Sequence, residues 1–393
     1  MGKRPLTESA KAARFTESVI REMTRVAREH GAINLAQGFP DFPAPELLKE
    51  AAVEAIRADV NQYAVTWGSD RLRAAIGEFM RRRRGVDIEP DRQVTVCCGA
   101  TEAMVAAMMG VLDEGDEVLI PEPFYENYGP DGILCGAIPR FVPLGADFRL
   151  DLEAMRRACG PRTRAVVLNT PHNPTGRVFD REEMDGLCAL VQERDLLLIT
   201  DEIYEEILYV GPHACPLTRP GMAERTIVVS GASKTFSVTG WRVGWTISPP
   251  ELTGGIRKVH DFLTVGAPAP LQEAVAAAME QWTDQDYDAM RAEYEARRRI
   301  MFEGLQASGF RCNLPEGAYY IMAEAPGLQR REEDDTAFAM RLVHEAGVAT
   351  VPGSSFFDDP ADGRHLVRFC YAKREETLRE AVARLTAWAE RQG

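Results

Sequence analysis

Short apolar runs alternate with longer amphipathic stretches through the middle of the chain, from about residue 90 to residue 250. The run DLLLIT at 195–200 is apolar without alternation, which is typical of a strand whose two faces are both covered by helices. The six short apolar runs lie at 93–98, 117–121, 137–144, 164–169, 195–200 and 226–230. Helical stretches at 100–112 and near 124–134 separate the first three runs. The pattern predicts an α/β protein with a mostly parallel sheet flanked by helices.

The pattern changes toward the end of the chain. A long helical region covers about 250–308, and mixed α/β segments follow it. These segments comprise YYIMAE, a helix at 336–346, HLVRFCY and a closing helix at 375–391. We therefore predict a large domain at 46–285, and a second, smaller α/β domain built from 1–45 and 286–393.

Charge and composition exclude several classes of protein. The 393 residues are 45% hydrophobic and 27% charged, with a formal net charge of −14, so the surface repels nucleic acid. No apolar run approaches the ~20 residues of a membrane span, and the charged N-terminal segment lacks the apolar centre of a secretory signal. The eight cysteines and six histidines are scattered, which argues against a disulfide framework and a metal site. These features predict a cytoplasmic protein with no membrane, metal or nucleic-acid partner.

A lysine and an arginine stand out in the segment SGASKTFSVTGWRVGW at 230–245. Lys234 follows the run at 226–230, at the edge of the sheet where open α/β folds bind ligands. Most lysines are solvated surface charges, but the flanks of Lys234 are small or apolar. Such surroundings lower the pKa of an amine and suit it to form a Schiff base. Arg242, eight residues later, is able to hold a phosphate bidentately.

Polar residues also follow two other predicted strands. Asp201 comes directly after LLLIT, where it could cap the next turn or pair with a pyridinium nitrogen. Tyr204 is three residues further on and could reach the same ring. In NTPHNPTG at 169–176, the Asn-Pro and Thr-Gly pairs indicate a loop, and Asn173 is the amide we expect to meet a ligand oxygen. His172, beside it, is interpreted as a loop residue.

The segment CGATEAM at 98–104 opens a predicted helix. Gly99 allows a close backbone approach, and the free N–H groups of a helix start favour a phosphate. The chain contains no G-x-x-x-x-G-K-[ST] loop and no G-x-G-x-x-G fingerprint, which argues against nucleoside triphosphates and dinucleotides. The four arginines at 81–84 precede a glycine and are interpreted as the cationic end of a helix.

Taken in order, these motifs resemble the fold-type I, pyridoxal-phosphate (PLP)-dependent aminotransferases of class I/II. The resemblance is closest to the subgroup of kynurenine, glutamine and methionine aminotransferases. It extends over nearly the whole chain and includes INLAQGFPDFP at 33–43, NQYAVTWGSDRLRAAI at 61–76, VPGSSFF at 351–357 and VRFCYA at 367–372.

The resemblance implies a role for each residue near the cofactor ring. Lys234 would carry PLP as a Schiff base and then move the proton between the substrate α-carbon and the cofactor. Asp201 would pair with the pyridine nitrogen, while Asn173 and Tyr204 would hydrogen-bond the ring oxygen. Tyr125 takes the place of the aromatic residue stacked on the ring. Lys234, Asp201 and Tyr204 are thus the predicted catalytic residues.

The resemblance also implies which residues hold the phosphate and the substrate. The predicted phosphate residues are Gly99, Ala100, Thr101, Ser230, Ser233, Arg242 and, from the neighbouring subunit of a homodimer, Tyr63. Family members usually carry a serine three residues before the lysine, where this chain has Gly231. Either Ser230 shifts in, or the contact is lost or supplied by Ser233 or water. Arg368 would clamp the substrate α-carboxylate with Gly38 and Asn173.

The expected reaction is ping-pong transamination between an L-amino acid and a 2-oxo acid such as 2-oxoglutarate. Phe39, Trp67, Tyr125 and Tyr128 would suit an apolar, aromatic, glutamine-like or methionine-like donor, and no arginine for a distal carboxylate is evident. The same Lys–Asp–Arg set serves β-lyases, decarboxylases, racemases and amino-acid oxidases, so these reactions stay open. A non-catalytic PLP sensor is a remote alternative, because the chain shows no basic helix-turn-helix segment.

Overall fold

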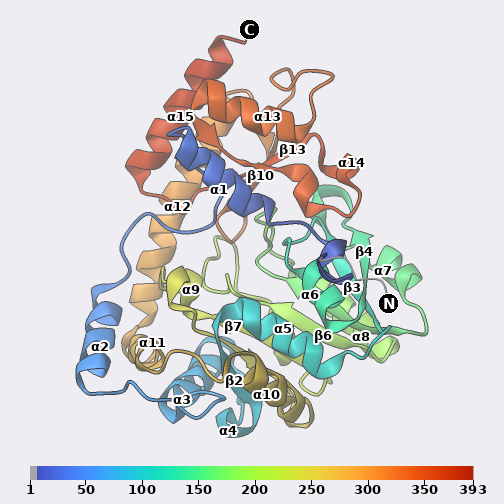
Figure 1. Ribbon diagram of the computed structural model, residues 1–393, viewed down its shortest axis with the longest axis vertical. Helices are drawn as coiled ribbons and strands as arrows, with labels where there is room; N and C mark the ends of the chain where they lie inside the picture. The colour runs from blue at the N-terminus through green and yellow to red at the C-terminus, as the bar shows by residue number, and fades with distance from the viewer. Residues whose placement is uncertain (1–6, 393) are drawn as a thin grey trace, which may run out of the picture.

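The computed structural model describes residues 7–392, and its centre is a seven-stranded sheet with strand order β2-β8-β7-β6-β5-β3-β4 (Figure 1). The strands are β2 (Val94–Cys97), β3 (Glu117–Glu122), β4 (Ile138–Pro143), β5 (Thr163–Asn169), β6 (Leu197–Asp201), β7 (Thr226–Gly231) and β8 (Gly244–Ile247). β8 runs antiparallel to both of its neighbours, whereas β4, β3, β5, β6 and β7 pair in parallel. The predicted α/β class with a mostly parallel sheet is confirmed, although β8 was not foreseen.

Helices cover both faces of this sheet. Val118 and Val167 pack with residues of α5 and α10 on one face, while Leu119 and Val166 pack with residues of α8 on the other. Because successive strand residues point to opposite faces, both sets must be apolar, which accounts for the continuous apolar runs. The helices of this region are α2 (Glu46–Arg57), α3 (Asp70–Phe79), α4 (Pro90–Gln93), α5 (Gly99–Val111), α6 (Tyr128–Cys135), α7 (Leu152–Ala158), α8 (Arg181–Glu193), α9 (Ala232–Thr235), α10 (Pro250–Thr264) and α11 (Ala269–Gln281).

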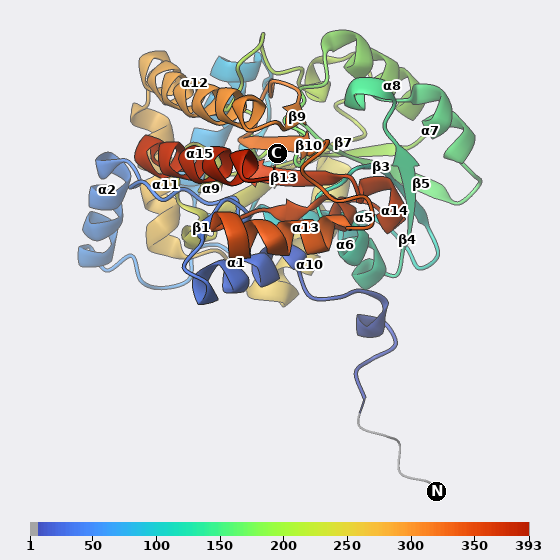
Figure 2. The same ribbon diagram turned by 90° about the horizontal axis from the view of Figure 1, so that it is seen from above.

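The predicted helical region at 250–308 consists of three helices: α10, α11 and the 24-residue α12 (Asp284–Ala307). Pro268 occupies the N-cap position of α11, and Thr283 forms a capping box with Asp286 at the start of α12. In Figure 1, α12 rises from the large sheet to the C-terminal segments, and Figure 2 shows it beside α15 (Glu375–Glu390).

The C-terminal segments form a second sheet of four antiparallel strands, in the order β12-β13-β10-β9. They are β9 (Arg311–Cys312), β10 (Tyr320–Glu324), β12 (Val351–Pro352) and β13 (Leu366–Cys370), accompanied by α13 (Asp335–Arg341), α14 (Pro360–Gly363) and α15.

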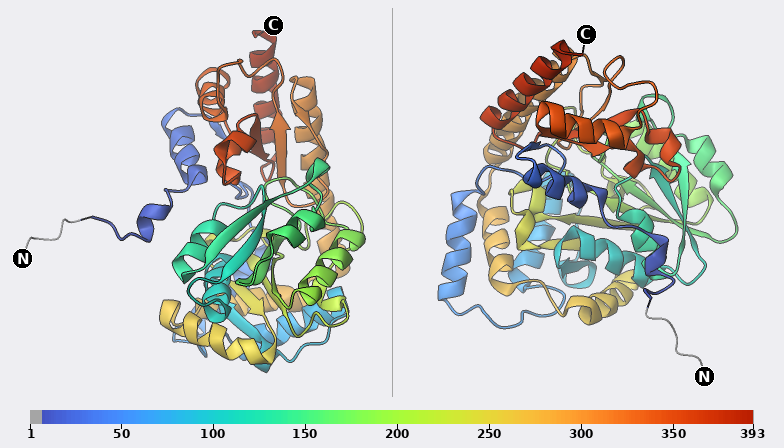
Figure 3. Two further views of the ribbon diagram at one scale, coloured as in Figure 1. Left: turned by 90° about the vertical axis from the view of Figure 1, so that its right-hand side faces the viewer. Right: turned by 45° about the horizontal axis from the view of Figure 1, so that its top comes forward.

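The N-terminal part of the chain joins these C-terminal segments. β1 (Ile33–Asn34) pairs in parallel with β11 (Val348–Ala349), and α1 (Val19–Glu29) packs Ile20 and Met23 against the same region. Figure 3 shows the blue N-terminal helix beside the orange and red C-terminal segments. This pairing supports a smaller domain built from both ends of the chain. The boundaries at residues 45 and 285 remain predictions, and residues 1–6 and 393 lie outside the described range.

Within residues 7–392, no helix combines the length and the apolar character that crossing a bilayer requires.

The four arginines at 81–84 form a helical turn that Gly85 ends in the left-handed conformation. Arg84 makes buried ion pairs with Glu205 and Glu206 at 2.7 and 2.8 Å, and Arg83 pairs with Glu206 at 2.6 Å. The interpretation as a cationic helix end is confirmed, and two of its charges are used inside the protein.

Candidate active site

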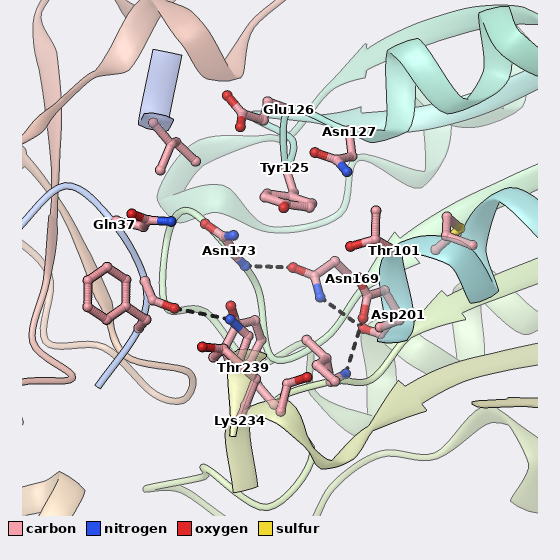
Figure 4. A pocket seen from close by; sticks show the side chains of 18 of the residues that line it. Gln37, Thr101, Tyr125, Glu126, Asn127, Asn169, Asn173, Asp201, Lys234 and Thr239 are labelled. Atoms are coloured by element: carbon pink, nitrogen blue, oxygen red, sulfur yellow. Dashed lines mark hydrogen bonds between the residues drawn. The ribbon is translucent and has the colours of Figure 1, made fainter. Parts of the chain in front are cut away.

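A cavity of about 430 Å³ lies at the carboxyl ends of β5, β6 and β7, as the open-sheet rule predicts (Figure 4). The predicted residues that line it are Gly38, Ala100, Thr101, Tyr125, Asn173, Asp201, Tyr204, Ser233, Lys234, Arg242 and Arg368. They come from both ends of the chain and from the large sheet. Four predicted residues do not line the cavity of the described chain: Gly99, Ser230, Tyr63 and Trp67.

Lys234 lies on the short helix α9, directly after β7, with its amine inside the cavity. Its Nζ donates a hydrogen bond to the carbonyl oxygen of Gly38 at 3.1 Å and lies 5.6 Å from the ring centres of Tyr204 and Tyr319. Burial lowers the pKa of the amine to about 8, and the charge of Asp201 opposes this decrease. A larger share of the amine is therefore neutral and nucleophilic near pH 8 than in a solvated lysine.

Asp201 ends β6 with both carboxylate oxygens engaged. Tyr128 Oη donates to its Oδ2 at 2.8 Å, and the backbone N–H of Ile203 donates to its Oδ1 at 3.2 Å. The Ile203 contact is the turn-capping role foreseen from the sequence, and it coexists with a place in the cavity wall. Burial raises the pKa of this carboxyl to about 6, and the Tyr128 hydrogen bond and the Lys234 charge oppose the increase. At neutral pH the group is an anion able to hold a cationic ring nitrogen.

Asn173 and Arg368 form a fixed pair on another wall. Arg368 Nη1 donates to Asn173 Oδ1 at 2.7 Å, and its Nη2 donates to the carbonyl oxygen of Ala36 at 2.7 Å. The buried guanidinium lies between the rings of Tyr320 and Phe356, at 4.2 and 4.8 Å from their centres. A guanidinium oriented in this way suits a planar carboxylate.

Arg242 and the start of α5 form a third part of the cavity wall. Arg242 Nη1 donates to the carbonyl oxygen of Thr239 at 2.9 Å, and its Nη2 approaches Thr101 Oγ1 at 3.5 Å. Gly99 has φ +82°, and a Cβ there would lie 2.4 Å from Arg242 Nη2. Gly99 therefore acts by letting the arginine reach the N-terminus of α5, whose free N–H groups favour an anion.

The structure corrects the assignment of Ser230. Its Oγ donates to Glu205 Oε1 at 2.6 Å and Ser230 does not line the cavity, whereas Ser233 does. A Cβ at Gly231 would lie 2.9 Å from both Gly244 Cα and the Val243 carbonyl oxygen. This close approach of β7 and β8 explains why the chain has no serine at position 231.

Four residues support the site in roles that the sequence did not predict. Asn169 accepts from the Asn173 N–H at 2.7 Å and donates to the Asp201 carbonyl oxygen at 2.9 Å (Figure 4). Tyr320 Oη lies 3.0 Å from Tyr204 Oη, and a Cβ at Gly38 would fall 1.9 Å from the Tyr320 oxygen. Tyr128, expected from the sequence only to contact the substrate, donates a hydrogen bond to Asp201. Asp131 is a further carboxyl in the wall, besides Asp201 and Glu126.

Two histidines serve the structure around the site. His172 lies in the loop after β5, as interpreted from the sequence. Its ring is buried with Nδ1 2.7 Å from Thr175 Oγ1, and burial lowers the pKa of the ring to about 3. His260, with Glu102 and Cys97, forms the group of potential metal ligands found within residues 7–392. Its two ring nitrogens contact Glu102 Oε2 at 3.0 Å and the Thr66 carbonyl oxygen at 2.8 Å, so both are already used.

Asp131 provides a stability prediction. It lies on α6, is 4% exposed, and its Oδ2 has no partner among the described residues. Burial, helped by the charge of Asp201, raises the pKa of Asp131 to about 8. The folded protein thus keeps a proton that the unfolded chain releases near pH 4, so this group makes stability fall between pH 4 and 8, by about 1.4 kcal/mol per pH unit.

Asp131→Asn should raise the melting temperature of the cofactor-free protein more at pH 8 than at pH 5. An equal shift at both pH values would contradict the raised pKa.

The site fits a phosphorylated aldehyde cofactor. A buried amine of lowered pKa faces a cavity whose walls also carry an anion for a ring nitrogen and, at the start of α5, an arginine and free N–H groups for a phosphate. Gly99 leaves room for the Arg242 guanidinium at this phosphate cradle, since a Cβ there would collide with it. Fold and site together define a PLP-dependent enzyme of fold type I.

Comparison with known proteins agrees with this class. The family model for aminotransferase class I and II matches residues 30–385. The chain is 42% identical over 390 residues to the probable N-succinyldiaminopimelate aminotransferase of Mycobacterium tuberculosis, covering 96% of this chain and 97% of the relative. It is 34% identical over 401 residues to human kynurenine–oxoglutarate transaminase 1, covering 93% and 94%. The solved methionine aminotransferase of Escherichia coli superposes with a TM-score of 0.92 at 35% identity, covering 98% of this chain and 100% of that one.

The chain belongs to the class I and II aminotransferase family. Its cofactor is PLP, and its reaction is the transfer of an amino group. None of these relatives is named for a lyase, decarboxylase, racemase, oxidase or sensor function, so the comparisons give the alternative reactions no support.

Proposed function

We propose that the protein transfers the amino group of an apolar, aromatic, glutamine-like or methionine-like L-amino acid to a 2-oxo acid such as 2-oxoglutarate, by a ping-pong mechanism. The observation that carries this proposal is the arrangement of Lys234, Asp201 and Arg368 around one cavity. The relatives named for methionine and for kynurenine with oxoglutarate support the substrate class. The aromatic side chains of Phe39, Tyr125 and Tyr128 in the same wall also favour it.

Each of these residues has a separate role in the proposed reaction. When bound, PLP supplies an electron-accepting ring, and Asp201 keeps the ring nitrogen protonated. Arg368, fixed by Asn173 and two aromatic rings, orients the substrate through its α-carboxylate. Of the residues that line the cavity, only Lys234 carries an amine, and we assign to its Nζ the transfer of the α-proton. Tyr125 faces the cavity from the side opposite Lys234 in Figure 4, where it would cover the ring.

The absorption spectrum of the purified holoenzyme tests this proposal. A suitable amino acid should convert the yellow enzyme to the pyridoxamine phosphate form, and a 2-oxo acid should restore the yellow colour. A yellow enzyme that releases product from the amino acid without reaching the pyridoxamine form would move the function to another PLP reaction. A protein that binds no PLP would overturn the cofactor assignment.

We also propose that Tyr63 contributes to the phosphate site of a second copy in a homodimer. Tyr63 is 85% exposed, and Phe262 on α10 is 91% exposed. These side chains, with the partly exposed Val65, Leu263 and Val265, are apolar surface that a second copy would cover. A cytoplasmic location remains a prediction.

Tyr63→Phe should weaken PLP binding about tenfold, because one hydrogen bond to a charged phosphate is lost. Equilibrium titration of the cofactor-free protein with PLP would measure this, and light scattering would give the molecular mass. A wild-type protein that is fully monomeric would exclude the shared site. So would a Tyr63→Phe variant that binds PLP as tightly as the wild type.

A further inference from the structure

Four cationic side chains line the cavity: Arg21, Lys234, Arg242 and Arg368. The proposed function uses three of them, for the cofactor amine linkage, the phosphate and the substrate α-carboxylate. Arg21 has no role in that scheme, although it belongs to the same cavity wall.

Arg21 lies in the first turn of α1, which Ser18 caps by accepting from the Arg21 backbone N–H at 3.3 Å. Among residues 7–392, its guanidinium has no salt bridge within 4 Å and no hydrogen-bond partner. Arg25, one turn later, differs in this respect because its guanidinium binds Glu17 at 2.6 and 3.2 Å. The donors of Arg21 are therefore available to a molecule in the cavity.

The surroundings of Arg21 contain one more donor and one competing charge. Gln37 lines the cavity and uses its Oε1 to accept from Thr24 at 3.0 Å, which leaves its amide nitrogen for a ligand (Figure 4). Glu126 lines the same wall and accepts a hydrogen bond from the Ser18 hydroxyl. Of the nearby carboxylates, Glu17 is already neutralised by Arg25.

We infer that Arg21 binds the distal carboxylate of a dicarboxylic amino acid or 2-oxo acid while Arg368 holds the α-carboxylate. This inference rests on the proposed function and extends it to a residue that selects the substrate. A five-carbon dicarboxylate such as 2-oxoglutarate brings a second negative charge into a partly buried cavity, where it needs a cationic partner. The planar guanidinium matches a carboxylate in a bidentate fashion. An apolar donor leaves Arg21 in contact with solvent, so one cavity accommodates both kinds of substrate.

The test compares Arg21→Ala with Arg28→Ala, a matched variant at an exposed position of the same helix that does not line the cavity. Single-turnover recovery of the yellow colour from the pyridoxamine phosphate form gives kcat/KM for each 2-oxo acid. Arg21→Ala should lose about 10- to 100-fold in kcat/KM with 2-oxoglutarate, the range for a hydrogen-bonded charge, and less than about twofold with 4-methylthio-2-oxobutanoate. Arg28→Ala should change neither value more than about twofold.

Binding of unreactive acids gives a readout that is independent of turnover. Calorimetry on the holoenzyme should show that Arg21→Ala weakens glutarate by the same factor while leaving pentanoate unchanged. Glu126→Gln should tighten glutarate, because a like charge is removed. Equal losses for both oxo acids, or unchanged glutarate binding, would overturn the role of Arg21. A wild-type enzyme that no amino acid converts to the pyridoxamine form would instead overturn the proposed function, so the two failures are distinguishable.

Discussion

Lys234→Ala is expected to abolish transamination while leaving the cavity able to bind PLP without a covalent bond. The amine of Lys234 both captures the cofactor aldehyde and transfers the substrate α-proton in our proposal. No other lysine lines the cavity of residues 7–392, so the protein has no second amine to take over. A single acid–base group contributes about 10²- to 10⁴-fold, and the loss of cofactor capture adds to this, so we expect a decrease on the order of 10⁴-fold or more.

The absorption spectrum and the half-reaction rate together check this result. The variant should release all its PLP on gel filtration under conditions in which the wild type stays yellow. Exogenous methylamine should restore part of the half-reaction rate, because it can replace the Lys234 amine as the group that transfers the proton. It could not restore the rate if the variant were inactive through misfolding. Lys258→Ala, which changes a lysine on α10 outside the cavity wall, is the control and should behave as the wild type. Turnover by Lys234→Ala above about 1% of the wild-type rate would contradict the role of this amine.

The sheet could be predicted from the sequence because its strands are buried on both faces. Continuous apolar runs such as the one at 195–200 have few alternative interpretations when helical stretches separate them. β8 was missed because its four residues, Gly244–Ile247, follow the Trp-Arg-Val sequence of the lysine motif without a turn signal. Its antiparallel pairing with β2 and β7 is a long-range contact that local pattern does not encode.

The site was predictable where a residue follows a strand at the ligand-binding edge, as Asp201 and Lys234 do. It was not predictable where the direction of a side chain decides its role. Ser230 is only four residues from Lys234, yet its hydroxyl points to Glu205. Arg21 and Asp131 reach the cavity because α1 and α6 pack beside it, and neither has a sequence motif to mark it. Their roles depend on tertiary packing, which spacing along the chain does not reveal.

Asp201→Asn is expected to lower the transamination rate about 10²- to 10³-fold. The neutral amide cannot balance the charge of a protonated ring nitrogen, and breaking one side of a buried ion pair typically costs about 3–5 kcal/mol. The amide oxygen can still accept from the Ile203 N–H, and the amide nitrogen can donate to the Tyr128 hydroxyl, so the local fold should survive. Stopped-flow half-reactions with a good amino donor would measure the loss. A rate within about fivefold of the wild type would show that the ring nitrogen does not depend on this carboxylate.

The pH dependence of cofactor binding separates this charge effect from a structural one. Burial raises the pKa of Asp201 to about 6, and only the carboxylate form attracts the ring nitrogen. In the Lys234→Ala background, binding is not covalent and the lysine charge no longer favours the carboxylate. PLP affinity should therefore fall as the pH drops below a midpoint higher than 6, and approach a tenfold loss per pH unit. The added Asp201→Asn change should remove this dependence. Tyr128→Phe deletes the hydrogen bond that favours the carboxylate, so it should move the midpoint to higher pH without removing the dependence. A midpoint that stays in place in Tyr128→Phe would assign the titration to a group other than Asp201, because the hydrogen bond acts on that carboxyl directly.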